Sequence, residues 1–169
     1  MAADGIQYAG EFTISDAKIF SSSGNVVRLD GLVQSITIFE SMYKPSMTGK
    51  IAILDTNSLV KNLPIIGQEF LSFKIKTTSV TGTLKEDIID FTDNVFNIYK
   101  IDNRIIDDKI EVLILHFASG EKLLNSRVRV SKSYTNSIND IVQDVLQNES
   151  YLNTKKDLFI EGTVGVRKI

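Results

Sequence analysis

The stretch from Gln34 to Ile75 constrains the fold most, because apolar and polar residues alternate in it three times. A period of two places successive side chains on opposite faces of a strand, so each run predicts a half-buried strand. Three such strands close together in the sequence predict a β-barrel or sandwich. The alternating apolar residues are Ile36 and Ile38, then Ile51 and Ile53, then Leu71, Phe73 and Ile75.

The breaks between these runs indicate how the strands are connected. Pro45 cannot donate a hydrogen bond to a strand ladder, so it marks the connection between the first two strands. Asn57 and Ser58 can cap a helix of one or two turns, which Pro64 and Gly67 would end. We therefore expect one short helix beside the sheet.

Further strands are expected on both sides of this stretch, at residues 11–20, 26–29, 95–101, 109–118 and 127–130. The run from Lys109 to Ala118 is apolar on both faces, which favours a strand in the centre of a sheet. Together these runs predict a mainly β domain over residues 1–131.

The residue pattern changes after Val130, where a polar connector leads into one apolar stripe at helical spacing. Asn136 or Ser137 can cap this helix, and Asp140 lies near its first turn. The stripe consists of Ile138, Ile141, Val142, Val145 and Leu146. Residues 157–169 then read as a strand, so we expect residues 132–169 to begin a smaller α+β domain and to break off partway through it.

Composition excludes several classes of protein. The chain has no cysteine, which excludes disulfides, thiolate zinc sites and a cysteine nucleophile. A net charge of −2 predicts no overall attraction to nucleic acid or to anionic lipid. The sequence shows neither a signal peptide nor an apolar run long enough to cross a bilayer, so we expect a soluble protein made in a cytoplasm.

Residues that could carry chemistry are few. The one histidine, His116, lies inside an apolar run and is more typical of a strand residue than of a base. The acidic residues Glu86, Asp87, Asp90 and Asp93 could hold a hard cation if they lay on a helix. Apolar residues interrupt them, which favours a solvated loop or a strand edge.

Two other groups could contact partners. Arg127 and Arg129 would share one face of a strand, and with Lys132 they could touch phosphate or an acidic surface; a solvated strand face is the competing interpretation. Met42, Tyr43 and Met47 lie in or beside a connection, where they either cover the core or meet another chain.

A resemblance to a known family comes from residues Glu40 to Ile75. The elements are Glu40-Ser41-Met42-Tyr43, the strand Gly49-Lys50-Ile51-Ala52-Ile53-Leu54-Asp55, the short helix and Gly67-Gln68-Glu69. This order is similar to the first domain of the baseplate hub proteins of contractile-tailed phages of the T-even type. The resemblance is clear over this block and looser over the rest of the chain.

The resemblance implies a tail-tube-type β-barrel with a structural role in the virion, without enzymatic activity or a cofactor. Three copies of such a chain would form the central hub ring, which joins the tail tube protein to the central spike protein and lines the channel for genomic DNA. Contacts with tape-measure and baseplate wedge proteins, no membrane binding, and assembly in the host bacterial cytoplasm are also implied. The implied subunit-interface residues are Glu40, Ser41, Met42, Tyr43, Met47 and Asp55.

Other functions stay open at the level of the sequence. Hubs of this type usually carry a second tube-type domain, which this chain is too short to contain, so it is either part of a longer hub or a shorter relative. A type VI secretion spike or an R-type pyocin would use the same domain. A small β-barrel that binds an apolar ligand is the main alternative, and an enzyme using the carboxylates of Glu86 to Asp93 is a third.

Overall fold

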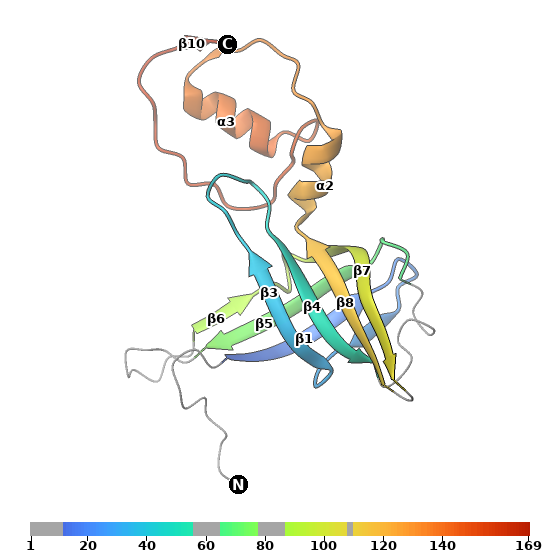
Figure 1. Cartoon of the computed structure of the whole chain (residues 1–169). Helices are drawn as coiled ribbons and strands as arrows, with labels where there is room; N and C mark the ends of the chain where they lie inside the picture. The colour runs from blue at the N-terminus through green and yellow to red at the C-terminus, as the bar shows by residue number, and fades with distance from the viewer. Residues whose placement is uncertain (1–11, 56–64, 78–86, 108–109) are drawn as a thin grey trace. The chain divides into compact units, whose positions relative to one another are not determined.

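The computed structural model describes residues 12–55, 65–77, 87–107 and 110–169 (Figure 1). The chain forms two compact units. The first unit comprises Met1–Glu40 and Met47–Ser119, and the second comprises Ser41–Ser46 and Gly120–Ile169. The domain boundary expected after residue 131 therefore lies inside the second unit.

The first unit is built on an eight-stranded antiparallel sheet, which confirms the expectation of a mainly β fold. Along the sheet the order is β2-β1-β5-β7-β8-β4-β3, and β6 pairs with β5. β8, apolar on both faces, lies between β7 and β4, so its expected central position is confirmed. The strands are β1 (Phe12–Phe20), β2 (Val26–Arg28), β3 (Val33–Phe39), β4 (Thr48–Asp55), β5 (Phe70–Thr77), β6 (Asp87–Asp90), β7 (Phe96–Asp107) and β8 (Ile110–Ala118).

The sheet curls back on itself. Its two end strands, β2 and β3, are joined by only four residues, 29–32, which reach at most about 14 Å. Leu29 N–H donates to the Ala17 carbonyl at 2.8 Å, and Leu54 N–H donates to the Leu32 carbonyl at 2.8 Å. The connection therefore bonds to strands at both ends of the sheet. In Figure 1, β3, β4 and β8 cross in front of β1 and β5.

Irregular pairing helps to bend the strands. The register of β1 against β5 shifts between Ser15 and Lys18, and Asp16 there adopts a positive φ of 53°. Asp30 Oδ1 accepts the Ala17 N–H at 3.2 Å, which stabilises the bulge. The pairing of β7 with β8 shifts twice. Bulges of this kind increase strand twist and bend a sheet.

The concave side of the curled sheet is filled with apolar side chains from strands all around it. Four phenylalanine rings meet there, with the ring of Phe96 at 4.8 Å from that of Phe117 and at 5.6 Å from that of Phe73. Phe91 contacts both Phe73 and Phe96. Around the rings lie the fully buried residues Ile19, Leu29, Ile51, Ile53, Leu71, Ile98 and Leu115.

The second unit contains α2 (Gly120–Arg127), α3 (Ile138–Gln147) and a ribbon of β9 (Thr135–Asn136) with β10 (Arg167–Lys168). α3 occurs where the apolar stripe predicted it, with Ser137 as the N-cap residue and Asp140 in the first turn. The Ser137 side chain makes no cap bond to the backbone and instead hydrogen-bonds the Asp140 carboxylate. Within the described residues, neither helix is long and apolar enough to cross a membrane.

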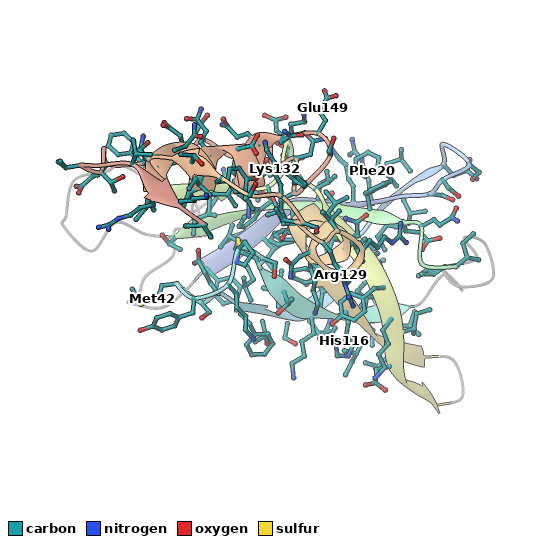
Figure 2. All side chains as sticks on the ribbon, turned by 90° about the horizontal axis from the view of Figure 1, so that it is seen from above. Phe20, Met42, His116, Arg129, Lys132 and Glu149 are labelled. Carbon is teal, nitrogen blue, oxygen red and sulfur yellow. The ribbon has the colours of Figure 1, made fainter. Side chains whose placement is uncertain are left out.

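One polar network ties the segment before β9 to α3. The Tyr134 hydroxyl donates to Asp144 at 2.7 Å, and Lys132 lies 3.3 Å from the same carboxylate oxygen and 4.8 Å from the centre of the Tyr134 ring (Figure 2). The Asn148 amide donates to the other oxygen at 2.9 Å. These bonds, that from Asn148 first, lower the pKa of Asp144, and the Asp144 bond raises the pKa of Tyr134.

Two strand predictions were wrong. Residues 127–130 were expected to form a strand, but Arg127 ends α2 and the chain then runs irregularly to residue 134. Residues 157–169 were expected to form a strand, but the strand there is only β10, Arg167–Lys168. In the first case the helix formers Glu121 to Leu124 favour α2, which takes in Arg127, the first of the alternating residues. The helix expected after Asn57 lies outside the described residues.

Candidate functional site

Three of the six residues implied to form a subunit interface, Ser41, Met42 and Tyr43, lie in one turn that follows β3. Ser41 Oγ accepts the Tyr43 N–H at 3.3 Å, and the Ser41 carbonyl accepts the Lys44 N–H at 3.1 Å. A serine at the first turn position commonly makes this local bond. The turn places Met42 and Tyr43 in solvent, each with 89% of its surface exposed.

Met47 lies in a different environment from Met42 and Tyr43. Its side chain packs against the buried core of the first unit. Its N–H donates to Ser119 Oγ at 3.2 Å, and its carbonyl accepts the Ser119 N–H at 2.9 Å. Met47 therefore fits the interpretation that these residues cover the core. Met42 and Tyr43 lie in solvent, where they could meet another chain.

The two remaining implied interface residues are acidic. Glu40 is exposed directly after β3. Asp55 is the last residue of β4 and stands opposite Glu111 in the register. Of the six implied residues, Ser41, Met42 and Tyr43 belong to the second unit, and Glu40, Met47 and Asp55 belong to the first.

The other motif residues have clear structural roles. Gly49 lies in β4 opposite Ile38 and Phe117, and a Cβ atom there would meet Phe117 Cζ at 2.3 Å and the Thr37 carbonyl oxygen at 2.5 Å. Only a residue without a side chain allows the Phe117 ring to cover the strand at this point. The Gly-led strand of the motif is therefore explained by packing.

Glu69 is fully buried, with 0% of its surface exposed, at the entry to β5. Its carboxylate accepts the N–H of Ile66 and of Gly67 at 2.9 Å, and that of Gln68 at 3.1 Å. Gly67 has a φ of 89°, a left-handed conformation that favours glycine. The Gly-x-Glu step of the motif thus builds a loop that closes around its own carboxylate.

His116 lies on the outer face of β8 (Figure 2), between Lys50 and Lys100 in the register. Its Nε2 is 3.5 Å from Asp102, whose carboxylate also pairs with Lys100 at 3.0 Å. The surrounding charges thus belong to an ion-pair group on the face of the sheet.

The acidic cluster forms a strand edge, which was the favoured interpretation. Glu86 lies outside the described residues, and Asp87 to Asp90 form β6, which pairs only with β5 in the described part of the sheet. Asp93 is exposed in the following turn. Among the described residues, no group of three or more histidine or acidic side chains could hold a metal ion.

Asp90 is held by its neighbours. Thr92 donates to Asp90 Oδ1 through its hydroxyl at 2.6 Å and through its backbone N–H at 2.8 Å, and Lys74 lies 3.0 Å from the other oxygen. These interactions, the Thr92 hydroxyl first, lower the pKa of Asp90 to about 2. The Asp90 contacts also raise the pKa of Lys74.

The pKa of Asp90 predicts a specific pH dependence. A carboxylate whose folded pKa is lowered stabilises the fold above its ordinary pKa of 3.8, and this contribution is lost as the pH falls toward about 2. In urea denaturation at a series of pH values, wild type should therefore exceed Asp90→Asn in stability near neutral pH. The difference in the free energy of unfolding between wild type and Asp90→Asn should narrow as the pH falls from 3.8 toward about 2. Asp157→Asn, an exposed carboxylate in the other unit, is the control, and a constant difference for Asp90→Asn would contradict the prediction.

Sequence reasoning missed one feature of the surface. Phe159 and Val164 are almost fully exposed, and Ile138 and Val142 of α3 are exposed by about two fifths. α3 has no buried residue. The signal was present as apolar residues in a segment that we interpreted as a strand.

No protein-family model matches this chain, and no curated protein shows significant sequence similarity to it.

Proposed function

We propose that this chain is a structural subunit of a contractile-tail baseplate. In this proposal its first unit is a tail-tube-type β-barrel, and three copies form the central hub ring. The ring joins the tail tube to the central spike and lines the DNA channel. The chain has no catalytic role and works by binding copies of itself and its neighbours.

The exposed pair Met42 and Tyr43 is the observation that carries this proposal. A methionine and a tyrosine that are 89% exposed gain almost nothing from hydrophobic burial in the isolated chain. Both residue types are enriched where proteins meet. The turn that presents them comes directly after β3 and belongs to the motif that resembles phage hubs.

The architecture of the first unit supports the same proposal. The sheet is curled, and its described part leaves open edges at β2, β3 and β6. Open edges are sites of unwanted pairing unless they are protected or completed by another chain. In a ring of copies, one surface of each copy binds a different surface of the next copy, so an open edge on every copy can be covered by its neighbour.

Two further features favour a channel-forming subunit over a ligand-binding barrel. The interior of the curled sheet is filled by the four phenylalanines and the buried aliphatic residues around them. The first unit also contains ten basic and fifteen acidic residues, an excess of five negative charges. A negative surface repels the phosphates of DNA and so lets DNA pass without binding.

The oligomeric state tests the proposal. Sedimentation velocity over a series of concentrations should show a trimer, and electron microscopy should show rings. Tyr43→Ser and Met42→Ser should each weaken association by about tenfold, as expected for large side chains at an interface. The readout is the apparent dissociation constant.

Ile66→Ser serves as the matched control, because Ile66 is also an exposed apolar residue of a connection but lies outside the implied interface. Its association should equal that of wild type. A chain that stays monomeric at high micromolar concentration, or an assembly that Tyr43→Ser and Met42→Ser leave unchanged, would refute the proposed role.

A further inference from the structure

The segment from Phe159 to Ile169, here called the terminal segment, is unusually apolar for an exposed stretch. Four of its side chains, those of Phe159, Val164, Val166 and Ile169, are at least two thirds exposed. Single exposed apolar residues are normal on protein surfaces, but four within eleven residues indicate a contact surface. In this segment β10 pairs with β9, Ile169 exchanges backbone hydrogen bonds with Tyr134, and Thr163 hydrogen-bonds Asn139. The other side of β10 has no strand partner in the described part of the chain.

The terminal segment belongs to the second unit, which carries a net positive charge. The second unit contains nine basic and six acidic residues, an excess of three positive charges, whereas the first unit has an excess of five negative charges. β10 itself consists of Arg167 and Lys168, both exposed, and lies between Val166 and Ile169. A partner for this segment should therefore offer an acidic and apolar strand edge.

In its described part the first unit offers open edges at β2, β3 and β6, and the edge of β6 fits. β2 ends in the basic Arg28, and β3 has no charged residue within its bounds. β6 has the sequence Asp-Ile-Ile-Asp, and its two isoleucines, Ile88 and Ile89, are each half exposed. β6 thus combines acidic ends with an apolar middle, and β10 combines basic residues with apolar neighbours.

We propose that the terminal segment of one copy adds as a strand to the β6 edge of a second copy. Backbone hydrogen bonds would join the two edges, the isoleucines would meet the valines of the segment, and opposite charges would set the pairing. Because β10 and β6 are different surfaces, the contact is head-to-tail and closes into a ring when the rotation is suitable. This inference rests on the self-association in the proposed function and names the strands that carry it.

The absence of cysteine in the sequence makes cross-linking a clean test. One set of full-length chains carries Ile88→Cys or Ile89→Cys, and a second set, with a tag that changes its mass, carries Val164→Cys or Val166→Cys. The sets are mixed in all four combinations and oxidised, and the cross-linked products are separated by mass. Each chain has one cysteine, so every disulfide joins two copies. Val26→Cys on the β2 edge, which is equally exposed, replaces the β6 position in the control.

We expect mixed-mass dimers with β6 cysteines in at least one combination, at a yield at least fivefold above that of the Val26→Cys control. Lys168→Glu should lower this yield, whereas Arg129→Glu, the same charge change at another exposed residue of the second unit, should not. Equal yields from the β6 and β2 cysteines, or no mixed dimer at all, would overturn the inference.

Sedimentation of the same chains separates this failure from failure of the proposed function. If wild type forms trimers while the β6 and terminal-segment cysteines do not cross-link, the hub proposal stands and this contact is wrong. If wild type remains monomeric, the hub proposal fails as well.

Discussion

Gly49→Ala is expected to destabilise the first unit by about 3 kcal/mol, at the upper end of the usual cost of overpacking a core. The added Cβ would lie 2.3 Å from Phe117 Cζ and 2.5 Å from the Thr37 carbonyl oxygen. The ring could move, but the carbonyl belongs to the neighbouring strand β3 and moves only with the sheet. Urea denaturation followed by far-ultraviolet circular dichroism measures the loss.

Two comparisons show whether the cost comes from this contact. Gly162→Ala adds the same methyl group where no atom lies within 4 Å, so its stability should stay within about 0.5 kcal/mol of wild type. In a chain that already carries Phe117→Leu, Gly49→Ala should cost less stability than in wild type. The leucine side chain is shorter than the phenylalanine ring and leaves empty the space that the ring edge occupies next to Gly49. Equal unfolding midpoints for Gly49→Ala and wild type would refute the packing explanation.

Glu69→Ala is expected to cost about 3 kcal/mol, because it removes an acceptor from three backbone N–H groups at once. The N–H groups of Ile66, Gly67 and Gln68 donate to the carboxylate at 2.9 to 3.1 Å. Glu69 itself is fully buried. Water can replace part of the lost bonding, since the loop itself is largely exposed. Urea denaturation measures the loss of stability, and proteolysis at residues 65–69 measures the opening of the loop.

Glu69→Gln keeps the size of the side chain and changes only its hydrogen bonding. The amide oxygen can still accept from Gly67 and Gln68, but the amide nitrogen would face the Ile66 N–H as donor against donor. We expect about half the loss of Glu69→Ala. Glu40→Ala, at an exposed glutamate of the same unit, should change stability by less than about 0.5 kcal/mol. If Glu69→Ala were as mild as this control, the loop would not depend on its carboxylate.

Periodicity identified most strands of the first unit because their environment is simple. A strand with one face toward a core needs an apolar residue at every second position, and Ile51 and Ile53 are fully buried while Lys50 is exposed. The same argument located α3 from a stripe at helical spacing. These patterns are local, so the sequence is sufficient to find them.

The wrong predictions have a common physical cause. Alternation at residues 127–130 and apolar content at residues 157–169 describe side chains, whereas a strand also requires a neighbouring backbone to bond with. Of the segment 157–169, the residues with such a neighbour are Arg167 and Lys168, opposite β9, and Ile169, which exchanges backbone hydrogen bonds with Tyr134. The sequence pattern cannot show which segments find a partner.

The candidate interface shows the same division. The motif singled out Met42, Tyr43 and Met47 together, and the structure separates them, since Met47 packs on the core and the other two are in solvent. The motif also contained Gly49 and Glu69 without a reason for either. Gly49 is needed because the Phe117 ring of β8 packs against it, and Glu69 is needed because its carboxylate accepts three N–H groups of one loop. Both contacts exist only in the folded chain.

From the sequence alone one obtains a mainly β unit without cysteine chemistry, followed by an amphipathic helix, because side-chain periodicity records which face of each element is buried. Tertiary structure alone decided the order of the strands, the joining of β2 to β3 by four residues, and which apolar side chains stay in solvent. The reason is that pairing and burial are relations between distant segments, and a periodic pattern specifies a face but not the segment that will cover it.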